Sequence, residues 1–224
     1  MCIRDRAWKE HKIVSFYDAD KSHCHVVGTS GDHEVLGRLM RREACRLRMD
    51  QAELSYAVTD GAEWIARQYS RQLPMLQVHI LDFYHLREHV IAASHVLYGE
   101  GTSKAMNWQS AMLSCVWEQG SLVFLDRLSR SLSQQKTASK RAALGSLRQY
   151  VSKRIDMTDY PTFRALGYDC GSGPTESLGG TLTDRLKGWG MRPDGDNADA
   201  MMALSGVYHS RLWDSYWRSV RAAA

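Results

Sequence analysis

Two short runs of strand-forming residues each end in an aspartate and pass directly into a helical pattern. The first run, residues 54–59, ends at Asp60-Gly61, and the second, residues 76–81, ends at Asp82. Apolar runs of this length before amphipathic segments predict the strand–helix units of an α/β protein. Because such proteins place ligands and catalytic groups at the carboxyl ends of their strands, the two carboxylates predict an acidic site along one sheet edge, of the carboxylate-and-metal kind.

The segment before these units predicts a hairpin and one helix. Residues 8–17 and 24–28 have strand patterns and are separated by a polar turn. Residues 31–49 form an apolar stripe at helical spacing, and the arginines on the remaining positions predict a solvated basic face. Residues 1–7 resemble neither a signal peptide nor a helix start. We expect them to be a leader foreign to the natural protein, joined to a truncated reading frame; a frayed natural terminus is the alternative.

Residues 89–165 are helical in pattern throughout and predict an all-α insertion, because no strand signal interrupts them. The first helix is expected to end at Gly99 or Gly101, and Gly120 separates the two that follow, over residues 102–119 and 121–133. A glycine-rich stretch at residues 167–174 follows, and Glu176 lies in the first turn of the next predicted helix, which the paired glycines Gly179 and Gly180 weaken. A single closing helix is expected over residues 197–220, with Trp213 and Trp217 in the core. The predicted organisation is therefore a leader (1–7), the first part of the core (8–88), the insertion (89–165) and the C-terminal helices of the core (166–224).

Composition narrows the class of protein only slightly. The 224 residues suffice for a large domain, and the hydrophobic content of 44% is ordinary for a globular protein. The net charge of +4 is compatible with nucleic acid but does not by itself indicate it. Five scattered cysteines without a CxxC pair predict reduced thiols, and no apolar run reaches membrane-spanning length. We therefore expect a cytoplasmic protein.

Five blocks in this order resemble the signature blocks of DDE transposases. They are Asp60-Gly-Ala-Glu-Trp-Ile, Leu81-Asp-Phe-Tyr-His85, Tyr160-Pro-Thr-Phe-Arg, Gly171-Ser-Gly-Pro-Thr-Glu-Ser177 and Arg185-Leu-Lys-Gly-Trp-Gly-Met-Arg192. The closest resemblance is to bacterial insertion sequences of the Kra type, which are related to the Mutator-like superfamily. It extends from Trp8 to about Trp217. It implies an α/β fold with an RNase H-like mixed-sheet core, interrupted by the all-α insertion.

The resemblance also implies roles for individual residues. Asp60 matches the second catalytic carboxylate and Glu176 the third, and both would be metal ligands for two Mg²⁺ (or Mn²⁺) ions in the intact enzyme. Asp82 and His85 match an Asp-x-x-His motif that supports the site or grips the DNA backbone. The implied partners are DNA, as transposon ends and target, and further copies of the chain in the DNA complex, at the bacterial nucleoid. The DNA-binding residues implied are Arg185, Lys187 and Arg192.

The first catalytic aspartate of such transposases has no counterpart here. It belongs to a strand upstream of residues 8–17, and the suspected truncation would have removed it together with that strand; Asp18 and Asp20 are poor substitutes because they lie at the wrong end of the hairpin. We therefore expect the fragment to be catalytically inactive as given. Loss of the strand would also leave two sheet edges unpaired and a poorly stable chain.

Several of these candidate site residues also have a purely structural interpretation. Asp60-Gly61 is a common turn former, Glu176 suits any helix start, and His85 could be a core histidine. Two other functions also remain open. One is a non-catalytic DNA-binding remnant or regulator of transposition, and the other is an RNase H-like nuclease or resolvase that uses water as its only nucleophile.

Overall fold

The computed structural model describes residues 10–187 and 195–223 and has a mixed α/β fold. The chain forms two compact units, and each is described by itself. Unit 1 comprises the described residues up to 52, residues 64–75 and those from 173 onward. Unit 2 comprises residues 53–63 and 76–172. The expected boundaries at residues 88 and 165 remain predictions.

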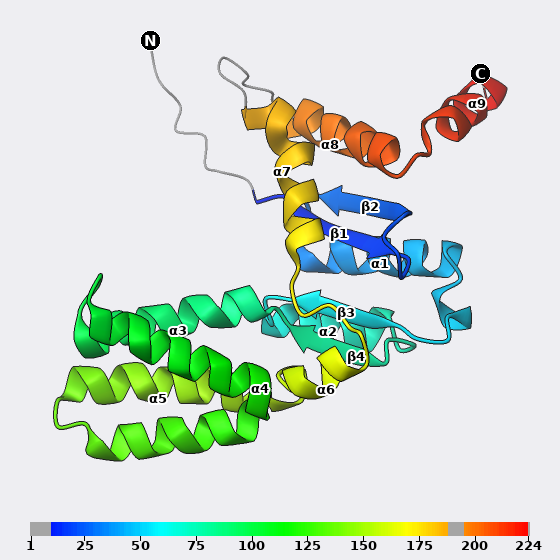
Figure 1. Ribbon diagram of the computed structural model, residues 1–224. Coiled ribbons are helices and arrows are strands. Elements are labelled where there is room, and N and C mark those ends of the chain that lie inside the picture. Colours follow the sequence, from blue (N-terminus) through cyan, green and yellow to red (C-terminus); the bar gives the residue numbers. More distant parts are fainter. Residues whose placement is uncertain (1–9, 188–194, 224) are drawn as a thin grey trace, which may run out of the picture. The chain divides into compact units, whose positions relative to one another are not determined.

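Unit 1 is built on an antiparallel hairpin of β1 (Lys12–Tyr17) and β2 (Cys24–Thr29), in which Ser15 lies opposite Val26. Adjacent residues of β2 point to opposite faces, as strand geometry requires. Val26 packs with Leu182 and Met202, whereas His25 hydrogen-bonds the buried Glu43 of α1 (His33–Arg46) at 2.8 Å. Helices therefore cover both faces of the hairpin (Figure 1).

Helix α1 begins at a cap formed by Asp32, whose side chain accepts hydrogen bonds from the amides of Glu34 and Val35. It lies close to α2 (Glu63–Gln72), because a Cβ atom on Gly37 would come within 2.0 Å of the Gln68 side chain. The short 3₁₀ helix η1 (Met49–Gln51) follows α1. The expected helix over residues 31–49 is thus confirmed, and it ends at Arg46, earlier than predicted.

Three helices complete unit 1: α7 (Gly173–Lys187), α8 (Gly195–His209) and α9 (Trp213–Ala223). The predicted single closing helix is wrong, because Arg211 has a left-handed backbone (φ 56°) and separates α8 from α9. Trp213 is 40% exposed, so its predicted place in the core is also wrong. At the end of α8, the Ser210 hydroxyl accepts from the Val26 amide (2.9 Å) and donates to the Val26 carbonyl (3.3 Å).

Unit 2 combines a parallel pair of strands with a helical block. Strands β3 (Tyr56–Thr59) and β4 (Val78–Leu81) pair with Thr59 opposite Leu81. The helical block consists of α3 (Phe83–Tyr98), α4 (Ser103–Gln134) and α5 (Ala138–Ser152), which pack side by side (Figure 1). The 3₁₀ helix η2 (Ile155–Met157) and α6 (Tyr160–Ala165) lead out of it.

The helical block is anchored by one large hydrophobic core that includes the end of β4. Ile80 and Leu81 are fully buried together with residues of α3, α4 and α5, among them Leu86, Phe124 and Leu144. Helix α4 is interrupted at Gly120, whose φ of 83° is not helical. The two helices that the sequence predicted on either side of this glycine are therefore joined by a kink.

The described strands form two separate two-stranded sheets. The mixed α/β class is confirmed, whereas an RNase H-like sheet stays a prediction. Among the described residues, no helix is both long enough and apolar enough to cross a membrane.

Candidate functional site

Asp60 lies immediately beyond the carboxyl end of β3, in a tight turn. One of its carboxylate oxygens, Oδ1, accepts a hydrogen bond from the amide of Ala62 at 2.8 Å, and the side chain is exposed. Gly61 has a positive φ of 73°, which a residue without Cβ adopts readily. The turn therefore presents a carboxylate to the surface at the strand end, as the sequence predicted, and an exposed carboxylate suits a hard cation.

The Asp60 turn is held by residues of the helical block. The Tyr150 hydroxyl donates to the Asp60 carbonyl at 3.1 Å, and Arg154 Nε donates to the Gly61 carbonyl at 2.8 Å. The Arg154 guanidinium lies over the Tyr150 ring, 4.1 Å from its centroid. Burial raises the pKa of Tyr150 to about 12, so its hydroxyl stays a donor at neutral pH. Neither residue was predictable as part of this turn, because no local pattern connects positions that are 90 and 93 residues apart.

A buried histidine lies below the same turn. His79 Nε2 is 2.7 Å from the Thr59 hydroxyl, which also accepts from the Gly61 amide at 3.2 Å. Burial lowers the pKa of His79 to about 4, and the nearby Asp60 carboxylate offsets only part of this effect. His79 is therefore neutral at pH 7, where it acts as a hydrogen-bonding support for the end of β3.

The Asp82 carboxylate is 2% exposed and occupied by four donors. Oδ1 caps α3 by accepting from the amides of Tyr84 (2.6 Å) and His85 (3.1 Å). Oδ2 accepts from the amide of Ser172 at 2.5 Å and from the Ser172 hydroxyl. Asp82 thus ties the end of β4 to the segment that leads into α7. With its oxygens engaged in this way, it supports the local structure and is poorly suited to bind a metal ion.

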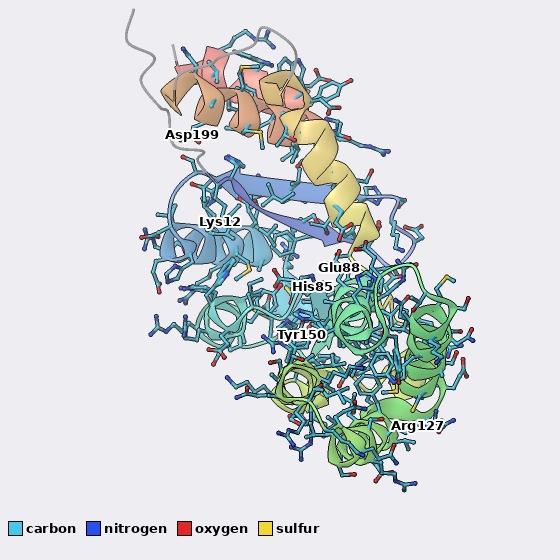
Figure 2. The ribbon with its side chains drawn as sticks, turned by 90° about the vertical axis from the view of Figure 1, so that its left-hand side faces the viewer. Lys12, His85, Glu88, Arg127, Tyr150 and Asp199 are labelled. Carbon is cyan, nitrogen blue, oxygen red and sulfur yellow. The ribbon has the colours of Figure 1, made fainter. Side chains whose placement is uncertain are left out.

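His85 lies on the exposed side of α3 with its ring 3.5 Å from the Glu88 carboxylate. Its side chain is 38% exposed, which excludes the core-histidine alternative. His89, one turn further on, stacks on Tyr150 at 3.8 Å, and its ring centroid is 5.3 Å from that of His85. Figure 2 shows His85, Glu88 and Tyr150 together on α3 and α5. Burial and the neighbouring His85 lower the pKa of His89.

Glu176 belongs to unit 1, where it is exposed in the first turn of α7. The preceding Thr175 holds this helix start against β1, because its hydroxyl is 2.7 Å from that of Ser15. Asp60 belongs to unit 2, so the two predicted metal ligands lie in different units. Arg192 and the side chains of Arg185 and Lys187 lie outside the described residues.

Asp18 and Asp20, the poor substitutes for the first catalytic carboxylate, accept hydrogen bonds within the β1–β2 turn. Asp18 accepts from the Ser22 hydroxyl at 2.9 Å and from the His23 amide at 3.0 Å, and its carboxylate lies 2.5 Å from the His23 ring. The hydrogen bond from the His23 amide contributes most to lowering the pKa of Asp18. Asp20 in turn accepts from the Ser22 amide at 2.9 Å. Both carboxylates therefore serve the turn.

Within the part of the chain that the structure describes, no three side chains of His, Cys, Asp or Glu converge as a metal site. Within unit 2, the exposed Asp60 carboxylate could contribute one ligand to a hard cation. Comparisons with protein-family models, with curated proteins and with solved structures gave no match.

Proposed function

We propose that this chain is part of a DDE-type transposase catalytic domain with an RNase H-like core, of the bacterial insertion-sequence kind in the Mutator-like superfamily. The observation that carries the proposal is the pair of parallel strands β3 and β4, each ending in an aspartate, Asp60 or Asp82, before a helix. The chain then passes through a helical block and returns to β4 at Ser172, four residues before Glu176.

The strand directions support the proposal further. An RNase H-like sheet combines an antiparallel hairpin with a parallel pair, and its central strand lies between them. The Val26 amide points to Ser210, so the opposite residue Ser15 turns its own amide and carbonyl away from β2. That edge of β1 is where a central strand would pair. In β3, the Thr59 carbonyl points to β4 and accepts from the Asp82 amide at 2.7 Å, so the carbonyl of the neighbouring Val58 points to the other edge of the strand.

Asp60 and Glu176 would hold the divalent ions, Mg²⁺ or Mn²⁺, through hard carboxylate oxygens. Two such metal ions would activate the attacking oxygen and stabilise the leaving oxygen during phosphodiester cleavage and strand transfer. Tyr150, Arg154 and His79 fix the turn that presents Asp60. Arg185, Lys187 and Arg192 would contact the phosphates of the transposon end and target, in a complex of several copies at the nucleoid.

Asp82 and His85 have different parts in this proposal. Asp82 is a positioning residue because it connects β4, the start of α3 and Ser172. His85 is partly exposed on α3 beside Glu88, and from this position it would contact the DNA backbone. The proposed catalytic site needs three carboxylates, and Asp60 and Glu176 supply two of them. We therefore propose that the fragment alone does not join DNA strands.

The first test is to read the source DNA upstream of codon 8 in the same frame. A strand-like run that ends in Asp-Gly supports the proposal, and its absence removes the catalytic part. The second test assays Mn²⁺-dependent cleavage and joining of DNA by the extended chain. Asp60→Asn should abolish both, whereas Asp50→Asn, at an exposed site in η1, should leave both unchanged.

The same assay separates the alternatives. Hydrolysis without joining would refute the transposase proposal in favour of an RNase H-like nuclease or resolvase. DNA binding without any metal-dependent chemistry would leave a non-catalytic remnant or a regulator of transposition.

A further inference from the structure

The positive charge of the chain is concentrated in one helical hairpin. Residues 121–155, here called the basic hairpin, comprise α4 beyond Gly120, α5 and the residues up to Ile155. They contain eight Lys and Arg residues and a single acidic residue, Asp126, which gives a net charge of +7. Since the whole chain carries +4, the other residues together carry −3. The hairpin is therefore the cationic part of an otherwise slightly acidic chain.

The cations of α5 lie opposite its buried face. Leu144, Leu147 and Val151 are buried in the core of unit 2. Arg141 and Arg148 are exposed and are seven residues apart, which places them two turns apart on one side of the helix. Arg148 Nε donates to the Ser129 hydroxyl at 3.1 Å, so this side of α5 faces along α4. The Cα atoms of Arg141 and Arg148 are thus about 10 Å apart along the helix axis.

Two of the eight cations of the basic hairpin are ion-paired within unit 2, Arg130 with Asp126 and Lys153 with Glu63 at 3.2 Å, whereas the cations of α5 are not neutralised there. Asp126 already pairs with Arg130 at 2.7 Å, and Arg127, which is labelled in Figure 2, donates to Gln119 at 3.4 Å. Among the residues that the structure describes, no carboxylate lies within 4.0 Å of the side-chain nitrogens of Lys136, Lys140, Arg141 or Arg148. An unpaired cluster of this size gains most from an external polyanion.

The surface between the cations suits a phosphate backbone better than a lipid. The exposed positions of α5 include Ser146, Gln149 and Ser152, and space is open around Gly145. Small and hydroxyl-bearing residues allow a backbone to approach and can donate hydrogen bonds to phosphate oxygens. The exposed large apolar side chains of the basic hairpin, Leu122 and Val123, lie at the start of its α4 part, and α5, which carries Arg141 and Arg148 and is described throughout, has none. A membrane-binding helix would need such residues beside its cations.

We propose that the basic hairpin binds the phosphate backbone of duplex DNA, with Arg141 and Arg148 as its central contacts and without reading base sequence. The choice of DNA rests on the proposed function; the phosphate-binding surface itself does not require catalysis or metal. In a transposase the hairpin would hold DNA away from the carboxylates and add to affinity through counterion release.

The test is binding of a fluorescent 30-base-pair duplex, measured by anisotropy in EDTA between 50 and 200 mM salt. The double variant Arg141→Glu/Arg148→Glu should weaken binding at least about tenfold and lower the slope of log Kd against log salt by about 2, one for each lost phosphate contact. The matched control is Arg38→Glu/Arg41→Glu, which makes the same charge change at exposed positions of α1. It should weaken binding less than threefold.

Three results would overturn the inference: no duplex binding by the unaltered chain, equal weakening by both double variants, or preference for anionic vesicles. Arg141→Gln/Arg148→Gln, checked for native circular dichroism, replaces the reversal variant if the latter unfolds, and should weaken binding about threefold to tenfold. Because EDTA removes metal chemistry, this assay measures DNA binding independently of catalysis. Absence of joining by the extended chain, with intact DNA binding, would count against the proposed function alone.

Discussion

Replacing Asp82 by alanine should destabilise unit 2 strongly, because one buried carboxylate serves both a helix start and a remote segment. The change removes the cap that accepts from the amides of Tyr84 and His85, and it leaves the amide and hydroxyl of Ser172 without their acceptor. A lost cap costs about 1 kcal/mol. Two hydrogen bonds to a charged acceptor add about 1.5 kcal/mol each. The expected loss of unfolding free energy is therefore about 4 kcal/mol.

Asp32 provides a matched control for this prediction. It caps α1 in the same way, accepting from the amides two and three residues ahead, but it is exposed and has no remote partner corresponding to Ser172 among the described residues. Asp32→Ala should therefore remove a cap alone and cost clearly less than Asp82→Ala. The difference between the two variants isolates the link from β4 to Ser172.

Urea unfolding followed by circular dichroism measures the free-energy changes, and hydrogen exchange at the amides of Tyr84, His85 and Ser172 locates them. Exchange at all three should rise in the Asp82→Ala variant. In a double-mutant cycle with Ser172→Ala, the coupling between Asp82 and Ser172 should exceed about 1 kcal/mol. A loss no larger than that of Asp32→Ala, or additive single variants, would refute the reasoning.

Three further predictions concern the Asp60 turn. Lowering the pH from 7 to 5 should destabilise unit 2 by on the order of 2 kcal/mol, because His79 binds a proton below pH 6.5 when unfolded but only near pH 4 when folded. Urea titrations should show this loss of unfolding free energy, and the His79→Asn variant should lack it. Gly61→Ala should cost about 2–3 kcal/mol in the same titrations, since it combines a positive φ with a contact of 2.7 Å to Arg154, and an unchanged midpoint would contradict this. Tyr150→Phe should cost about 1 kcal/mol by calorimetry while its ring stays stacked on His89, and a neutral result would mean that the hydroxyl bond to Asp60 is not needed.

Local signals in the sequence were enough to predict most helices and strands. Asp32 and Gly99 mark the two ends of predicted helices, the first as a side-chain cap and the second with a φ of 90°. Gly120 was expected to separate two helices and is the site of the kink in α4. The break at Arg211 was missed because the apolar pattern continues across it and arginine carries no conformational signal for a left-handed backbone.

The candidate site was predictable only in its strand-end carboxylates. Asp60 and Asp82 follow their strands as expected, but the sequence could not show that one is exposed and the other enclosed by four donors. Tyr150 and Arg154 escaped notice because their contacts with the Asp60 turn are long-range, and both appeared to be ordinary helix residues. Gly179 appeared to be a weakness of α7, yet a Cβ atom there would crowd Ile13 at 3.2 Å, so the glycine allows α7 to approach β1 closely.

The contact between Ser210 and Val26 makes the two long edges of the β1–β2 hairpin chemically unequal. A single hydroxyl occupies both the amide and the carbonyl of the middle residue of β2, where an incoming strand would have to form its ladder. Growth of the sheet by edge-to-edge association, including the first step towards aggregation, is therefore blocked on this side. Another strand can therefore pair with the hairpin beside β1, whereas the hydroxyl of Ser210 blocks pairing beside β2.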